Sequence, residues 1–118
     1  MAKVIKLRNK TQIYGTSFHN GTVCASMLEL EDKFGVQASI ERDCKVNFAL
    51  DLEVDGTPFT IYDWKEGIIT KGTVVWFHIG TITEGSTKKV VDILKNDYNL
   101  MAKYETSEEI LARYGVNL

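Results

Sequence analysis

Apolar and polar residues alternate most regularly between residues 46 and 54 of the chain. A period of two predicts a strand with one buried face. Asp55-Gly56 follows directly and is a strong signal for a tight hairpin turn. The alternation resumes over 58–64 and predicts the returning strand, with Pro58 at its first position, where a missing N–H costs little. The apolar positions of the first segment are Val46, Phe48, Leu50, Leu52 and Val54.

Two further strands are predicted on either side of this hairpin. The segment 73–80 is apolar on both faces, which is typical of the most buried strand of a sheet or of one whose second face meets a ligand or a partner. Near the N-terminus, a few apolar residues among basic ones predict a short strand over 3–8. The apolar residues of 73–80 are Val74, Val75, Trp76, Phe77 and Ile79.

A helix is predicted before the hairpin, over 22–34. Its apolar residues recur at spacings of four, three and four, which places them on one face of a helix. Gly35 follows at the position where a left-handed C-cap is expected. The residues of this stripe are Val23, Met27, Leu30 and Phe34.

Two more helices are predicted in the last third of the chain, over 87–97 and 107–114. The first begins after Gly85 or Ser86 as its N-cap, and the second begins with Thr106 and Glu109 at capping-box spacing. The predicted inward-facing residues are Val90, Val91, Leu94 and Tyr98 in the first, and Ile110, Leu111 and Tyr114 in the second.

These elements predict an α+β fold. Strands gather in the middle of the chain and helices lie outside them, so the sheet is expected to be antiparallel rather than part of a parallel α/β fold. We expect three or four strands, over about 46–54, 58–64, 73–80 and, as the fourth, 3–8. The length of 118 residues is typical of a single domain, here 1–118.

Composition and charge exclude several classes of protein. A net charge of −2 makes duplex DNA an unfavourable ligand, because phosphate neutralisation needs a basic face. No segment has the length of a signal peptide's apolar region or of a membrane span, so we expect no membrane association. The two cysteines, Cys24 and Cys44, are too few for a disulfide framework and are interpreted as reduced thiols of a cytoplasmic protein. Two histidines and two separated cysteines show no metal-ligand spacing, and no cofactor is expected.

One candidate for chemistry is the loop from Gly80 to Lys88. Its glycines have P-loop spacing, but residue 86 is serine where a P-loop needs lysine, which argues against an NTPase. A helix N-terminus with nearby hydroxyls and lysines still has the chemistry of an anion site. A capped helix with solvated lysines explains the pattern better. The candidate anion-binding residues are Thr83, Ser86, Thr87 and Lys88.

A second candidate is a group of aromatic residues on the last two strands. If the apolar residues of 58–64 face the core, Tyr62 and Trp64 face away from it, near Lys65. Exposed aromatic rings on a sheet stack nucleobases in many proteins. Two alternatives remain open, since a helix that covers this face or an oligomer contact would also explain these residues. The candidate residues are Tyr62, Trp64, Lys65, Trp76 and His78.

A third candidate is catalytic. Asp63 on the neighbouring strand is placed to orient His78, and such a pair is a general base in many hydrolases. No serine or cysteine nucleophile has a recognisable turn around it, so a buried, hydrogen-bonded histidine is the preferred interpretation.

The order of motifs resembles a group of small proteins encoded by tailed bacteriophages. The matching strings are GTSFHNGTVCASMLELEDKFG, DCKVNFALDLEVDGTPFTIYDWKEG, WFHIGT and a helix with VVDIL, within about residues 15–98. Members share a T-S-x-x-G opening, an I-Y-D/N-W/Y-K strand and a W-x-I-G strand that leads into a helix. This chain has an additional Phe77 where the group has Trp-His-Ile-Gly, which leaves open how Trp76 and His78 face.

The resemblance implies a phage accessory protein made in the cytoplasm of the bacterial host. Such small proteins commonly inhibit a host or defence protein, or sequester a signalling nucleotide. We therefore expect a binding protein and not an enzyme, a homo-oligomer that counters host defence and binds a phosphorylated nucleotide. The alternatives are an inhibitor that contacts a host enzyme through the aromatic face and, less favoured, a small hydrolase.

Overall fold

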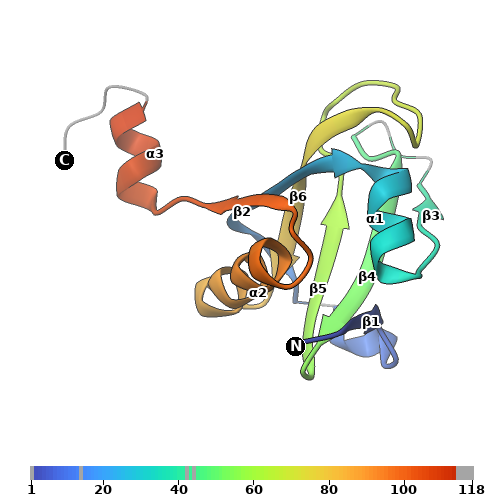
Figure 1. Ribbon diagram of the computed structural model, residues 1–118. Helices are drawn as coiled ribbons and strands as arrows, with labels where there is room; N and C mark the ends of the chain where they lie inside the picture. Colours follow the sequence, from blue (N-terminus) through green and yellow to red (C-terminus); the bar gives the residue numbers. More distant parts are fainter. Residues whose placement is uncertain (1, 14, 42, 44, 114–118) are drawn as a thin grey trace.

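The computed structural model describes residues 2–13, 15–41, 43 and 45–113. Cys44 and Tyr114, for which the sequence made predictions, lie outside the described residues. The elements in chain order are β1 (Val4–Lys6), the 3-10 helix η1 (Lys10–Ile13), β2 (Ser17–Ser26), α1 (Met27–Phe34), β3 (Ser39–Ile40), β4 (Phe48–Val54), β5 (Thr57–Tyr62), β6 (Val74–Thr81), α2 (Glu84–Asn96), β7 (Met101–Tyr104) and α3 (Ser107–Arg113) (Figure 1).

The described strands form one open antiparallel sheet of seven strands, in the order β1-β4-β5-β6-β2-β7, with β3 paired to β4. The prediction of an α+β fold with an antiparallel sheet is confirmed, including the strand near 3–8. The prediction of three or four strands was too low, because β2, β3 and β7 were not recognised. None of the described helices is long and apolar enough to cross a membrane.

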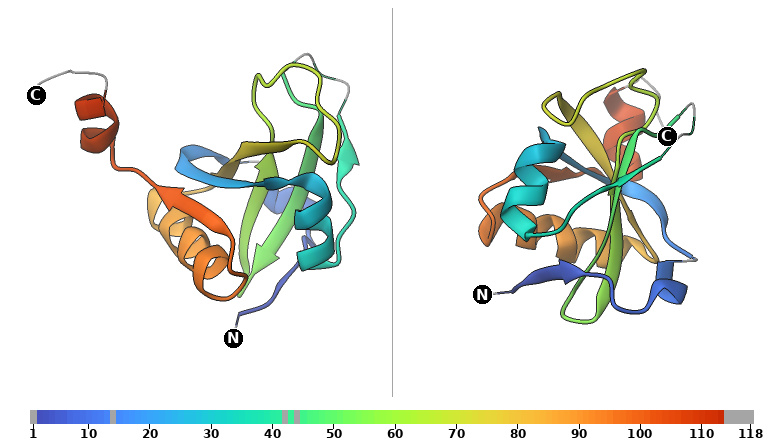
Figure 2. Two further views of the ribbon diagram at one scale, coloured as in Figure 1. Left: turned by 45° about the horizontal axis from the view of Figure 1, so that its top comes forward. Right: turned by 90° about the vertical axis from the view of Figure 1, so that its right-hand side faces the viewer.

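Both longer helices cover the same face of the sheet, here called the inner face (Figure 2). Met27, Leu30 and Phe34 of α1 and Val90, Val91 and Leu94 of α2 are all buried there. They pack against the inward-facing residues of the strands. The largest of these are Leu50, Leu52, Phe59, Ile61, Phe77 and Ile79.

The predicted helix over 22–34 is wrong in its first five residues. These belong to β2, and α1 begins only at Met27, after Ser26 as N-cap. Val23 is buried, as predicted from its spacing to Met27. It faces the core, however, from a strand that pairs with β6 on one side and β7 on the other. Pairing with two strands distant in sequence overrides the local helical spacing.

Turns that depend on local chemistry form as predicted. Asp55 and Gly56 have φ angles of 49° and 76°, the left-handed pair that a type I′ hairpin requires. Gly35 ends α1 with φ 65° and donates its N–H to the Glu31 carbonyl. The Thr106–Glu109 capping box is also present, with reciprocal hydrogen bonds of 2.9 and 3.1 Å.

Two predictions for the C-terminal third need correction. Helix α2 begins three residues earlier than predicted, because the hydroxyl of Thr83 accepts from the Ser86 N–H and caps the helix there. Helix α3 extends away from the rest of the molecule (Figure 1), so Ile110 and Leu111 are only half-buried.

Strand β2 approaches α2 most closely at Gly21. A Cβ atom at this position would overlap the Thr87 methyl group. Thr87 is fully buried and its hydroxyl is bonded to that of Thr81, so the methyl group has little freedom to turn away. We predict that Gly21→Ala lowers the free energy of unfolding in urea by about 1–3 kcal/mol, a typical cost of overpacking.

The matched control is Gly72→Ala, whose added Cβ lies no closer than 3.9 Å to its neighbours. It should leave the stability unchanged. Gly21→Ala combined with Thr87→Ser, which removes the methyl group and keeps the hydroxyl, should recover most of the loss. A Gly21→Ala variant as stable as the wild type would contradict this account.

Candidate ligand-binding face

The face of the sheet opposite α1 and α2, here called the outer face, carries the aromatic residues singled out from the sequence. Along β6, Phe77 and Ile79 are fully buried on the inner face, whereas Trp76 and His78 point to the outer face. The additional Phe77 therefore preserves strict alternation, and Trp76 and His78 share one face. Tyr62 of β5 lies directly opposite His78 and joins them.

Three rings gather around His78, and we call Phe18, Tyr62, Trp64 and His78 together the aromatic cluster. Phe18 stacks on His78 with ring centroids 4.0 Å apart. The Trp64 ring stacks on His78 with centroids 6.2 Å apart, and the Tyr62 ring meets the His78 ring edge-on with centroids 5.6 Å apart. Trp64 therefore lies on the same face as His78.

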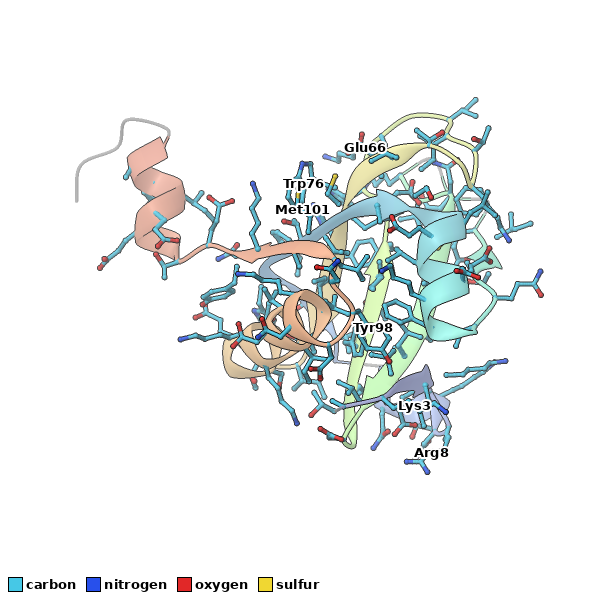
Figure 3. All side chains as sticks on the ribbon, viewed as in Figure 1. Lys3, Arg8, Glu66, Trp76, Tyr98 and Met101 are labelled. Carbon is cyan, nitrogen blue, oxygen red and sulfur yellow. The ribbon has the colours of Figure 1, made fainter. Side chains whose placement is uncertain are left out.

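The outer face is open. Phe18, Trp64 and Trp76 are 38, 38 and 37% exposed, respectively, so neither α1 nor α2 covers them, and α3 only borders the hollow beside Trp76 through Ile110. Figure 3 shows Trp76 and Met101 on the side of β2 away from α2, whereas Tyr98 lies on the helix side. The alternative that a helix covers the aromatic residues is wrong.

Three lysines stand beside the two indoles. The Nζ atoms of Lys45 and Lys65 each lie 5.7 Å from the Trp64 ring centroid. The Nζ atom of Lys103 lies 4.5 Å from the Trp76 ring and 3.6 Å from the Glu105 carboxylate. Ammonium groups at this range attract the ring face. They also place positive charge beside surfaces that can stack a base.

Two hollows flank the aromatic cluster on the outer face. One, of about 390 Å³, lies over β2, β6 and β7 and is lined by Phe18, Thr22, Trp76, His78 and Lys103 among others. The hydroxyl of Thr22 is buried and has no hydrogen-bond partner among the described residues. The other hollow lies over β4 and β5. It is acidic, and its lining includes Glu41, Asp43, Asp51 and Tyr62.

The residues predicted from the loop at 80–88 do not join this face. Thr83 and Ser86 are occupied in capping α2, and the hydroxyl of Thr87 bonds to Thr81 and to the Thr83 carbonyl. Lys88 is exposed on α2, on the other side of the sheet. Neither hollow of the outer face includes any of these residues. The predicted site residues therefore divide into two separate groups, and the loop belongs to the packing of α2.

The predicted pairing of His78 with Asp63 is wrong. Asp63 is fully buried and accepts hydrogen bonds of 2.8–3.0 Å from the Asn47 backbone N–H, the Asn47 amide and the Phe48 N–H. It holds the start of β4, one position after the outward-facing Tyr62. The His78 ring is half-buried and makes ring contacts but no hydrogen bond to a described residue, so the preferred interpretation of a hydrogen-bonded histidine is also corrected.

Several residues of the outer face were missed in the sequence. Phe18, Thr22 and Lys103 come from β2 and β7, strands that were not predicted, and Lys45 precedes β4. The only local signal was the alternation of Gly21, Val23 and Ala25 as buried positions, which was interpreted as part of a helix.

We predict a pH dependence of stability that originates at His78. Burial lowers the pKa of this imidazole from its ordinary value, so the unfolded chain takes up the proton first as the pH falls. The contribution is complete above about pH 6.5 and is lost as the pH falls through the folded-state pKa. Urea unfolding at pH 7 and at successive steps to pH 5 should show this loss, at most about 1.4 kcal/mol per pH unit for one group.

His78→Phe should flatten the dependence, because phenylalanine retains the stacking but cannot titrate. The carboxylates of Glu31 and Glu53, whose pKa values are lowered, lose their contribution only below about pH 4.5 and do not interfere. An equal slope of the unfolding free energy against pH in the wild type and in His78→Phe would contradict the assignment to His78.

Comparison of the chain with protein-family models, with curated proteins and with solved structures found no match in any of the three. The resemblance to phage accessory proteins therefore stays a prediction from the sequence motifs.

Proposed function

We propose that this protein is a binding protein, and that the outer face binds a phosphorylated nucleotide. The observation that carries the proposal is Trp64, an exposed indole with the ammonium groups of Lys45 and Lys65 each 5.7 Å from its ring. A nucleotide offers the complement of this arrangement, an aromatic base joined to an anion.

The energetics favour such a ligand. Stacking of one base on an aromatic side chain contributes about 1–3 kcal/mol and tolerates any base. The aromatic cluster also holds Trp64 in place, since its ring contacts both Tyr62 and His78. A ring that is already positioned loses little entropy on binding.

The biological setting comes from the sequence motifs. A phage accessory protein in the bacterial cytoplasm that sequesters a signalling nucleotide needs a binding surface and no catalytic group. The hydrolase alternative is not retained, because its predicted base, the pair of His78 and Asp63, does not form.

A second candidate is contact with a host protein or with another copy of the chain. Its specific support is an apolar patch at one end of the outer face. Trp76 and Met101 flank Cys24 from opposite sides, and Val74 lies two residues before Trp76. Val74 and Met101 are 64 and 65% exposed. Exposed apolar patches of this kind often mark protein interfaces.

We predict that Trp64→Ala weakens nucleotide binding by roughly tenfold or more, because it removes the stacking surface. Purified protein would be titrated with mono- and triphosphates of adenosine and guanosine and with their cyclic monophosphates, by calorimetry and by quenching of tryptophan fluorescence. Lys45→Gln combined with Lys65→Gln should weaken binding and reduce its salt dependence.

Two control variants should bind like the wild type. Leu28→Ala removes an exposed apolar side chain from α1, and Lys88→Gln removes a charge at the start of α2. Absence of binding by any of these nucleotides at high micromolar concentration would refute the proposal. In that case a loss of self-association or of a host-protein contact on Met101→Glu, with the fold intact, would favour the second candidate.

A further inference from the structure

The two indoles of the outer face stand on neighbouring strands that separate at this point. Strands β5 and β6 pair as far as Tyr62 and His78. In a continuing ladder, the next residues to face each other on the outer face would be Trp64 and Trp76. The ladder ends before them, and no ring contact joins the two indoles, whereas Trp64 contacts both Tyr62 and His78.

The backbone after β5 explains the separation. The N–H of Lys65 donates to the carbonyl of Lys45, which holds this segment on the β4 side of β5. Lys65 also has a φ of 56°, a left-handed conformation that turns the chain out of the strand. Trp64 and Trp76 therefore offer two separate stacking surfaces on one face.

Each surface has its own positive charge. The Nζ atoms of Lys45 and Lys65 lie beside the Trp64 ring, and that of Lys103 lies 4.5 Å from the Trp76 ring. The His78 ring contacts Trp64 and also lines the hollow of Trp76, so it connects the two positions. Glu105 lines the hollow of Trp76 as well, with its carboxylate 3.6 Å from the Lys103 Nζ atom. Each indole therefore has an ammonium group beside it, and the one beside Trp76 is paired with Glu105.

The hollow beside Trp76 also offers a polar group to a ligand. The Thr22 hydroxyl lies in the same cross-strand row as His78 and Lys103 and lines this hollow. It is buried with no partner among the described residues. A buried hydroxyl without a partner is costly in a native protein, and a hydrogen bond from a bound ligand would satisfy it.

We infer that the nucleotide bound by the outer face is a dinucleotide, with one base on Trp64, the second in the hollow at Trp76, and linking phosphates near the lysines. The inference rests on the proposed function and specifies its ligand class. A linear and a cyclic dinucleotide share this chemistry. A mononucleotide would occupy only one of the two positions.

The test compares adenosine monophosphate, the linear dinucleotide of adenosine with a 5′-phosphate, cyclic di-adenosine monophosphate and the guanosine counterparts of all three. Calorimetry on the full chain should show at least one dinucleotide bound about tenfold or more tightly than its mononucleotide, since a second stacked base is added. The linear and cyclic forms, measured separately, identify which linkage the face accepts.

Two variants separate the positions. Trp76→Ala should reduce dinucleotide affinity to about that of the mononucleotide and leave mononucleotide binding at Trp64 unchanged. Thr22→Val, of the same shape, should weaken dinucleotide binding several-fold without lowering stability in urea, because the hydroxyl that it removes is unpaired. Met101→Ala, at an exposed neighbour outside the hollow, is the matched control and should bind like the wild type.

Equal affinities for mono- and dinucleotides in the wild type would overturn the inference and leave the proposed function standing. An equal effect of Trp76→Ala on both ligands would overturn it as well. If no nucleotide binds, both fail together, and a change of oligomeric state in Trp76→Ala would then assign this face to protein contact.

Discussion

Burial of one face of the sheet by both longer helices is the constraint on which the rest of this structure depends. Side chains alternate across a strand, so covering the inner face commits every second residue of β4, β5 and β6 to the core. A shift of one residue in the pairing register of β6 would turn Phe77, which is fully buried, to the outer face. The partly exposed Trp76 and His78 would then face the core. The core thereby determines which aromatic side chains remain outside.

The contact between α2 and β2 illustrates how closely the inner face is filled. Gly21 leaves room for Thr87, whose hydroxyl bonds to Thr81 at the end of β6. The Thr87 hydroxyl, a candidate for anion binding in the sequence analysis, thus joins the helix to the sheet. Its neighbour Thr83 is occupied in the same way, as the N-cap of α2. A polar group that is already bonded within the fold has little to offer a ligand.

The outer face has the opposite character. The rings of the aromatic cluster contact one another, while Phe18, Trp64 and the separate Trp76 remain more than a third exposed. Lysines stand beside both indoles. Folding alone gains little from apolar surface left in water, so such a face is better explained by a ligand or a partner than by stability. The hollow over β4 and β5 is lined by Glu41, Asp43 and Asp51, whose charge disfavours an anion within that hollow.

The sequence by itself determined the elements whose cause is local. The hairpin at Asp55-Gly56, the end of α1 at Gly35 and the alternation of β4 and β5 follow from residue chemistry over a few positions. The sequence also singled out Tyr62, Trp64, Trp76 and His78, but it left open how Trp76 and His78 face and favoured a buried His78. Only the tertiary structure decided that residues 22–26 are strand, that β7 joins β2, and that the aromatic residues are uncovered. These outcomes depend on pairing between segments far apart in the chain, and local periodicity carries no information about a partner strand.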